Sequence, residues 1–249
     1  MTLLTCRDGL MGDFLGVLPV MIQLSKQDLL HVNIHPESLP LFHLLPKKYR
    51  IMLQEREEAL YGRKLEIDIL KAFALSHQYN CYMSQAHFPC LGLPLPPVPV
   101  KAELEFEAMN EPVYDYVLAP FSRSLPPQQR WAQAQWQRLV QLLPEKSFCI
   151  IGHARDEKDF VTGDHIAHLY NASMVKLINV LKKARGGLIS VVSGPSHLAF
   201  HLGVRNYLLT NQPMTWGINP EAVKICDPIG ALKAEKVAAL LREKELSVS

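Results

Sequence analysis

The chain's first candidate for acid–base chemistry is a carboxylate that follows two glycines. Asp13 stands after Gly9 and Gly12, where an apolar strand-like run has ended and a helical pattern begins. Glycines let a backbone approach a ligand closely, and the helix dipole stabilises a carboxylate at a helix start. Asp13 is therefore either a general base that faces a cleft or only a helix cap. The Gly-x-x-Gly-Asp spacing does not decide between them, because the fuller Gly-x-Gly-x-x-Gly pattern is missing.

A second set of residues has the composition of a diphosphate site. Ser122, Arg123, Ser124 and Arg130 follow another predicted strand and supply hydroxyl and guanidinium groups. Guanidinium groups bind phosphate oxygens through paired, charge-assisted hydrogen bonds. The alternative is that both arginines are solvated surface charges.

The stretch "VVSGPSHLAFHLGV", from Val191 to Val204, combines a strand end, a turn and a helix start. Gly194 and Pro195 end the apolar run, and proline suits the first turn of a helix. The first N–H groups of a helix have no partner within it, so such an end attracts phosphate. The alternative is an ordinary connection between a strand and a helix.

Metal-ligating patterns are weak. His197 and His201 are four residues apart, but "HLAFH" lacks the glutamate of His-Glu-x-x-His, and no third ligand is indicated. The cysteines are odd in number, widely spaced and never in Cys-x-x-Cys, which argues against disulfides and a zinc knuckle. The sequence therefore predicts no metal site and reduced thiols. The cysteines are Cys6, Cys81, Cys90, Cys149 and Cys226.

Composition describes an ordinary globular protein. The 249 residues are 48% hydrophobic and 20% charged, with a net charge of +2, so nothing demands a nucleic-acid partner. No apolar run has membrane-spanning length, and the start lacks a signal-peptide pattern, so we expect a cytoplasmic protein. The basic turn "PKKYR", residues 46–50, is either solvated or a contact for anionic lipid or a phosphorylated glycan.

Apolar periodicity predicts alternating strands and helices in both halves of the chain. Strands are expected at Leu3–Cys6, Leu29–Ile34, Tyr114–Phe121, Ser147–Gly152, Leu188–Val192 and Asn206–Thr210. Helices are expected at Phe14–Lys26, Gln54–His77, from Pro127 to Leu143, Ser173–Lys183, after Pro195, and from Leu232 to Lys244. Trp131 and Trp136 are expected in the core rather than against a ligand.

This alternation implies an α/β protein with parallel sheets covered on both faces. Four prolines in "LGLPLPPVPV", residues 91–100, forbid a helix and mark an extended link. We therefore expect two Rossmann-like domains that face each other across a cleft, residues 1–112 and residues 113–249, the first of them short.

Four segments together resemble glycosyltransferase family 9, the ADP-heptose:lipopolysaccharide heptosyltransferases. They are "CRDGLMGDFLGVLPV", "APFSRSLPPQQRWAQAQWQRLVQLL", "IIGHARDE" and "VVSGPSHLAFHLGV". The last is the most specific, because it matches the family's Asp-Ser/Thr-Gly-Pro-x-His-Leu-Ala block. The four segments follow the family's order and span nearly the whole chain.

The resemblance implies a GT-B fold with an acceptor-binding first domain and a nucleotide-sugar-binding second domain. The implied reaction is an inverting, metal-independent transfer of a heptose or hexose that needs no cofactor. The implied donor is a nucleoside-diphosphate sugar, ADP-linked as in this family, and the implied acceptor is a cell-surface glycan or glycolipid precursor such as lipopolysaccharide core. The implied place is the cytoplasm, with peripheral contact at the inner face of the bacterial inner membrane.

The resemblance also assigns residues. Asp13 is the implied general base, with Gly9 and Gly12 in the acceptor loop. The implied donor-binding residues are Ser122, Arg123, Arg130, Glu157 near the nucleoside, and Gly194, Pro195, Ser196 and His197 at the helix start.

The chain departs from the family at three points. Val192 replaces the aspartate before Ser-Gly-Pro, Arg130 replaces the usual lysine before tryptophan, and the first domain is short. Two alternatives therefore stay open: a noncatalytic GT-B-like relative that binds a glycan or a partner protein, and a nucleotide-sugar epimerase.

Overall fold

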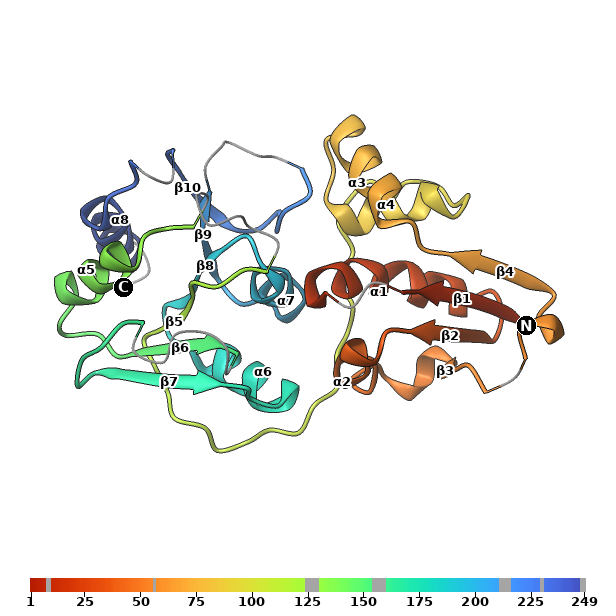
Figure 1. Cartoon of the computed structure of the whole chain (residues 1–249), viewed down its shortest axis with the longest axis horizontal. Helices are drawn as coiled ribbons and strands as arrows, with labels where there is room; N and C mark the ends of the chain where they lie inside the picture. Colours follow the sequence, from red (N-terminus) through yellow and green to blue (C-terminus); the bar gives the residue numbers. More distant parts are fainter. Residues whose placement is uncertain are drawn as a thin grey trace. The chain divides into compact units, whose positions relative to one another are not determined.

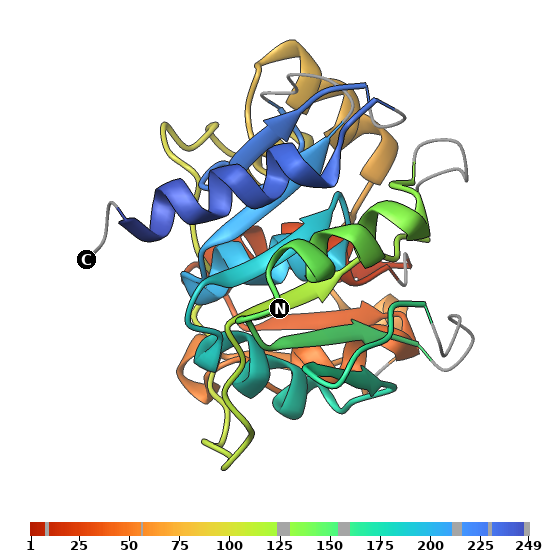
Figure 2. The same cartoon turned by 90° about the vertical axis from the view of Figure 1, so that its left-hand side faces the viewer.

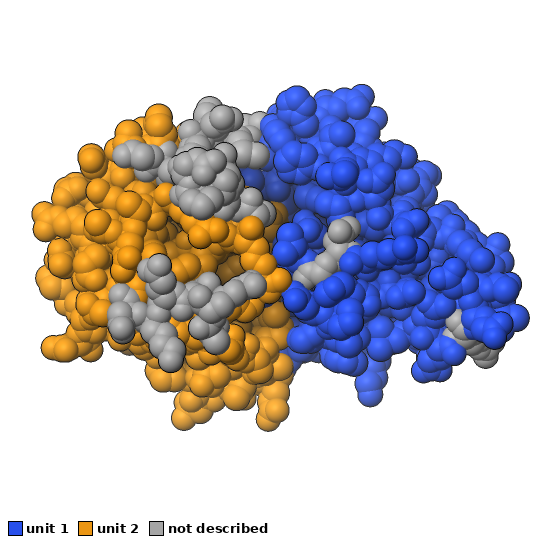
Figure 3. Space-filling model, viewed as in Figure 1, with its two compact units in different colours: residues 1–106, 214–220 blue, residues 107–213, 221–249 orange. Residues whose placement is uncertain are grey.

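The computed structural model describes residues 1–7, 10–55, 57–123, 130–153, 160–210, 216–228 and 231–246. The chain divides into two compact units (Figures 1 and 3). Unit 1 consists of Met1–Phe106 and Met214–Pro220, and unit 2 of Glu107–Pro213 and Glu221–Ser249. The chain therefore passes through most of unit 2, returns once to unit 1 and then completes unit 2.

Unit 1 is built on a four-stranded, fully parallel sheet in the order β3-β2-β1-β4. Its strands are β1 (Thr2–Cys6), β2 (Leu30–Ile34), β3 (Ile51–Leu53) and β4 (Arg63–Glu66). Its α-helices are α1 (Met11–Ser25), α2 (Leu39–Phe42), α3 (Ile69–Gln78) and α4 (Met83–Cys90). Short 3-10 helices lie at Pro36–Ser38, Lys47–Tyr49 and Glu58–Leu60.

Unit 2 is built on a six-stranded, fully parallel sheet in the order β10-β9-β8-β5-β6-β7. Its strands are β5 (Tyr116–Ala119), β6 (Phe148–Gly152), β7 (Ile166–Tyr170), β8 (Gly187–Val191), β9 (Asn206–Thr210) and β10 (Val223–Cys226). Its helices are α5 (Gln133–Leu142), α6 (Met174–Lys183), α7 (Gly194–Leu202) and α8 (Ala234–Leu246).

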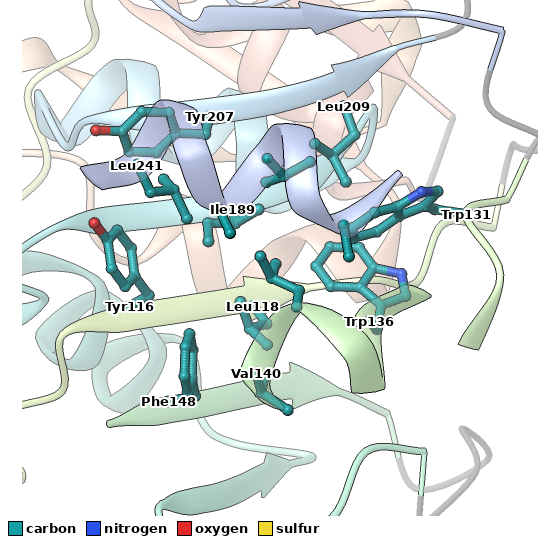
Figure 4. Packing of buried hydrophobic residues seen from close by; sticks show 14 of the residues in the cluster. Tyr116, Leu118, Trp131, Trp136, Val140, Phe148, Ile189, Tyr207, Leu209 and Leu241 are labelled. Carbon is teal, nitrogen blue, oxygen red and sulfur yellow. The ribbon is translucent and has the colours of Figure 1, made fainter. Parts of the chain in front are cut away.

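The core of unit 2 lies between the sheet and helices α5 and α8 (Figure 4). Leu118, Ile189 and Leu209, from three adjacent strands, pack with Trp136 of α5 and Leu241 of α8, and all five are buried. Helices α5 and α8 cover one face of the sheet, and α6 and α7 cover the other (Figure 2). The sheet is thus covered on both faces, which is why its central strands are buried and consist mostly of apolar residues.

In unit 1, helices α1 and α4 pack closely because α1 carries a glycine at the contact. A Cβ atom at Gly16 would lie 3.4 Å from Nε2 of His87 on α4. His87 is fully buried, and burial lowers its pKa from 6.5 to about 4. The imidazole is therefore neutral at pH 7 and acts as a packing group.

The strands expected in both halves are confirmed, as are the helices near Phe14–Lys26, Ser173–Lys183, Pro195 and Leu232–Lys244. The helix expected from Pro127 begins later, at Gln133, and Pro127 lies outside the described residues. The helix expected over 54–77 is wrong, because β4 occupies Arg63–Glu66 and pairs with β1, and α3 begins only after Asp68. The Asp68 side chain accepts a hydrogen bond from the Lys71 N–H at 2.8 Å, a typical N-cap.

Among the described helices, none combines the length and the apolar character that a membrane span requires. The basic turn at residues 46–50 is partly neutralised, because Lys48 pairs with Glu103 at 2.5 Å and the Tyr49 hydroxyl donates to the same carboxylate at 3.0 Å.

Candidate functional site

The strand order of unit 2 locates a candidate binding site at one edge of its sheet. Numbered along the chain from β5, the order β10-β9-β8-β5-β6-β7 is the doubly wound 6-5-4-1-2-3 arrangement. Its order reverses between β5 and β8, and in such sheets ligands bind beyond the carboxyl ends of the strands at the reversal. The segments that leave this point are those after Ala119 and after Val191.

The segment after β5 carries hydroxyl and guanidinium groups. Ser122 is buried, whereas Arg123 and Arg130 are exposed. Ser124 lies outside the described residues. Next to Arg130, the Trp131 indole is buried and donates from Nε1 to the Leu232 carbonyl at 2.8 Å. This bond anchors the Trp131 side chain, whereas the side chain of its neighbour Arg130 is exposed.

Trp131 and Trp136 belong to the core, as expected. Their ring centroids lie 4.8 Å apart in an edge-to-face arrangement of 75°. Both side chains are buried in the cluster between the sheet, α5 and α8.

The segment after β8 presents the start of α7. Ser193 is the N-cap in extended conformation, without a side-chain capping bond, and Gly194 and Pro195 form the first two helical positions. The Ser193 hydroxyl instead donates to the Val191 carbonyl at 3.1 Å. Among the described residues, the Gly194 N–H has no hydrogen-bond partner. Gly194 and Pro195 are half-buried, so this helix end offers a backbone donor and a positive dipole end to an anion.

The next two residues of α7 are turned into the protein. The Ser196 hydroxyl donates to Oδ1 of Asn206 at 2.8 Å, and its N–H donates to the Ser193 carbonyl at 3.0 Å. His197 is 9% exposed, and burial lowers its pKa from 6.5 to about 4. The imidazole is therefore neutral at pH 7 and brings no cation to a phosphate. Asn206 is not among the site residues that the sequence predicts, and the only signal for it is an asparagine at the start of an apolar run.

Asp13 lies at the corresponding edge of the sheet in unit 1. Strand order β3-β2-β1-β4 reverses between β1 and β4, and α1 follows β1 directly. Asp13 is half-buried and occupies the third position of α1. The expectation that it begins the helix is wrong, because Leu10 is the N-cap and no side chain caps this end. Asp13 still lies in the first turn of α1, at the positive end of the helix dipole.

Other predicted site residues are only partly described. Gly12 is half-buried in the first turn of α1, whereas Gly9 and Glu157 lie outside the described residues. Val192 is half-buried at the end of β8. Within the described ranges, no cluster of three or more His, Cys, Asp and Glu side chains is arranged to hold a metal ion.

A cavity of about 160 Å³ in unit 2 contains none of the predicted site residues. It lies between β6, β7, α6 and the segment before β5, and Cys149 and His168 are among its lining. Lys176 and Glu111 at this cavity form an ion pair with 3.7 Å between Nζ and Oε2. The chemistry of the strand ends is therefore separate from this cavity.

No protein-family model and no curated protein sequence matches this chain. Solved structures do match. TibC from enterotoxigenic E. coli H10407, an iron-containing dodecameric glycosyltransferase, superposes with a TM-score of 0.67 at 17% identity over 89% of this chain and 61% of TibC. The chain has the fold of the heptosyltransferases. It spans less than two thirds of TibC.

Two further structures support this fold. E. coli ADP-heptose LPS heptosyltransferase II matches with a TM-score of 0.60 at 13% identity over 98% of this chain and 100% of that protein. A family 9 glycosyltransferase from Veillonella parvula DSM 2008 matches with a TM-score of 0.68 at 11% identity, over 97% of each chain. The resemblance to family 9 that the sequence motifs indicate is thus confirmed at the level of the fold, as is the α/β class with two parallel sheets.

Proposed function

We propose that this protein is an inverting glycosyltransferase that moves a heptose or hexose from an ADP-linked donor to a glycan or glycolipid acceptor. One observation carries the proposal: the strand order reverses between the adjacent strands β5 and β8, so that Ser122 and Arg123 after β5 and the open start of α7 after β8 both follow the carboxyl ends of these strands. Both are suited to a diphosphate. TibC has been solved with ADP-D-beta-D-heptose, which supports ADP as the nucleotide.

The proposed chemistry needs a base for the acceptor and hydrogen-bond donors for the leaving diphosphate. The Asp13 carboxylate takes the proton of an acceptor hydroxyl, whose oxygen attacks the anomeric carbon of the donor. The bond from that carbon to the diphosphate oxygen breaks, the configuration inverts, and the electron pair leaves with the nucleoside diphosphate. Arg123, Arg130 and the Gly194 N–H stabilise the negative charge that develops there.

We propose that the transfer needs neither a metal nor another cofactor. Two guanidinium groups and a helix start can neutralise a leaving diphosphate, which is the task that a divalent cation performs in other transferases. TibC is iron-containing, so this part of the proposal needs its own test. Turnover that survives exhaustive chelation and dialysis supports it, and turnover that returns only with added metal contradicts it.

The acceptor proposed is a cell-surface glycan precursor such as lipopolysaccharide core, because heptosyltransferase II of the same fold acts in that class. Such acceptors are lipid-linked, so we propose a cytoplasmic enzyme that meets the inner face of the bacterial inner membrane peripherally. Co-sedimentation with vesicles that carry the acceptor, compared with plain vesicles, tests this placement.

The proposed function is tested directly by donor hydrolysis and transfer. We expect the protein to release ADP from ADP-heptose faster than UDP from UDP-hexoses, and to do so faster still with a lipopolysaccharide-core acceptor. Nucleotide binding without release from any donor would favour the noncatalytic alternative, which Val192 motivates. Recovery of an isomerised nucleotide sugar would favour an epimerase.

Arg130→Ala is expected to weaken ADP binding much more than adenosine binding. A hydrogen bond to a charged group contributes about 1.5 to 3 kcal/mol, so the ADP dissociation constant rises roughly 10- to 100-fold. Calorimetric titration of both ligands measures the split. Arg138→Ala is the control, because Arg138 is exposed on α5 and pairs with Glu235 at 3.0 Å. Equal losses for ADP and adenosine in Arg130→Ala would instead mean a folding defect.

A further inference from the structure

A hydrogen-bonded cluster of buried polar side chains lies next to the start of α7. Asn206 at the start of β9, Ser190 in β8 and Ser196 in α7 are each at most 1% exposed. Burying three polar side chains in an apolar layer destabilises the fold unless the side chains form hydrogen bonds. The hydrogen bonds among these three side chains therefore indicate the structural role of the cluster.

The carboxamide of Asn206 joins the sheet to the helix. Its Nδ2 donates to the Ser190 hydroxyl at 2.8 Å and to the Leu188 carbonyl at 3.3 Å. Its Oδ1 accepts from the Ser196 hydroxyl at 2.8 Å. The orientation of the amide is set by Leu188, since a carbonyl can only accept. Asn206 therefore has one end fixed on β8 and the other on the first turn of α7.

The hydrogen bond between Asn206 and Ser196 holds the first turn of α7, which carries the N–H of Gly194. Ser196 is the third residue of α7, and its own N–H donates to the carbonyl of Ser193 at 3.0 Å. The Ser193 hydroxyl in turn donates back to Val191 on β8 at 3.1 Å. The turn is thus attached to the sheet at both ends, before and after Gly194.

We propose that Asn206 is a positioning residue that holds the start of α7 in the orientation needed to bind a donor diphosphate. This inference rests on the proposed function. Asn206 itself is buried and does not touch the donor. It acts through Ser196, so its loss lets the first turn rotate and misdirects the Gly194 N–H. Binding of the diphosphate is therefore weakened. Binding of the nucleoside is unchanged, because the start of α7 does not hold it.

The test compares variants that cut the network at different points. Asn206→Leu removes both links at similar volume, Ser196→Ala cuts only the link to α7, and Ser190→Ala cuts only a link within the sheet. We expect Asn206→Leu and Ser196→Ala to weaken ADP binding about tenfold each, with no further loss in the double variant, while adenosine binding is unchanged. Ser190→Ala is the matched control and should bind ADP as the wild type does.

Thermal melts of each variant distinguish a folding defect from a specific loss of ADP binding. If Asn206→Leu does not fold, the pair Ser196→Ala and Ser190→Ala carries the same comparison, and Ser196→Thr, which keeps the hydroxyl, should restore ADP binding. The proposal is overturned if folded Asn206→Leu binds ADP normally, or if Ser190→Ala loses as much affinity as Ser196→Ala. A wild-type protein that binds neither ADP nor UDP would overturn the proposed function, and this inference with it.

Discussion

Asp13→Asn is expected to abolish sugar transfer while leaving ADP binding and the melting temperature almost unchanged. The amide cannot accept the acceptor's proton, and general-base catalysis contributes about 100- to 10,000-fold to rate, so kcat should fall by that factor. Asparagine has nearly the volume of aspartate, and the start of α1 has no side-chain cap to lose, so we expect the fold to be retained. Turnover with saturating donor and acceptor measures the effect.

Asp68→Asn is the matched control. Asp68 lies after β4, the strand beside β1, and its carboxylate caps α3 by accepting the Lys71 N–H at 2.8 Å. Asparagine caps a helix as well as aspartate does, so this variant should keep both stability and turnover. If Asp13→Asn keeps near-normal kcat, Asp13 is a helix-dipole residue and the base lies elsewhere. If both variants lose activity equally, charge in unit 1 matters rather than a proton acceptor.

The central strands were predictable because they are buried on both faces. Every residue of β5, β8 and β9 is buried, and most of these residues are apolar, with Ser190 in β8 and Asn206 and Thr210 in β9 as the polar exceptions. The edge strands β7 and β10 were missed because their residues are mostly half-buried and polar residues interrupt the pattern, as His168 does in β7. A strand at a sheet edge lacks the apolar signal that periodicity requires.

Strand β4 shows how local preference can mislead. Its sequence Arg-Lys-Leu-Glu consists of good helix formers, and it lies within a stretch rich in charged residues. The structure places it at the edge of the sheet in unit 1, where Arg63 to Glu66 pair with Thr2 to Thr5 of β1. Pairing with a distant strand outweighs helix propensity here, and one sequence gives no sign of that partner.

The candidate site was predictable only in outline. The glycines, prolines and arginines after strands indicate loops at a sheet edge, and the structure places Arg123 shortly after β5 and Gly194 shortly after β8, the two strands between which the strand order reverses. The sequence could not predict which side chains point into the protein and which point outward. Ser196 and His197 follow Gly194 directly, yet both side chains are buried. Asn206 becomes relevant only because β9 lies beside β8.

Gly194→Val is expected to lose ADP binding by about 100-fold or more while the protein still folds. Valine is tolerated at the first position of a helix, but its branched side chain covers the approach to the Gly194 N–H, which has no partner among the described residues. The added side chain excludes the diphosphate from this helix start, so the contact to the Gly194 N–H and the favourable helix dipole are lost together. Gly194→Ala, with a single methyl group, should lose less.

Titration with ADP, UDP and adenosine, together with thermal melts, separates a blocked site from a damaged fold. Gly62→Val is the control for added bulk, because a Cβ atom at Gly62 has nothing within 4 Å and this glycine lies in unit 1 beside the edge strand β4. We expect Gly62→Val to bind all three ligands as the wild type does, and Gly194→Val to keep only adenosine. A folded Gly194→Val protein with wild-type affinity for ADP or UDP would remove the start of α7 from the donor site. The observation that carries the proposed function would then lose one of its two parts, and Arg123 and Arg130 alone would have to hold the diphosphate.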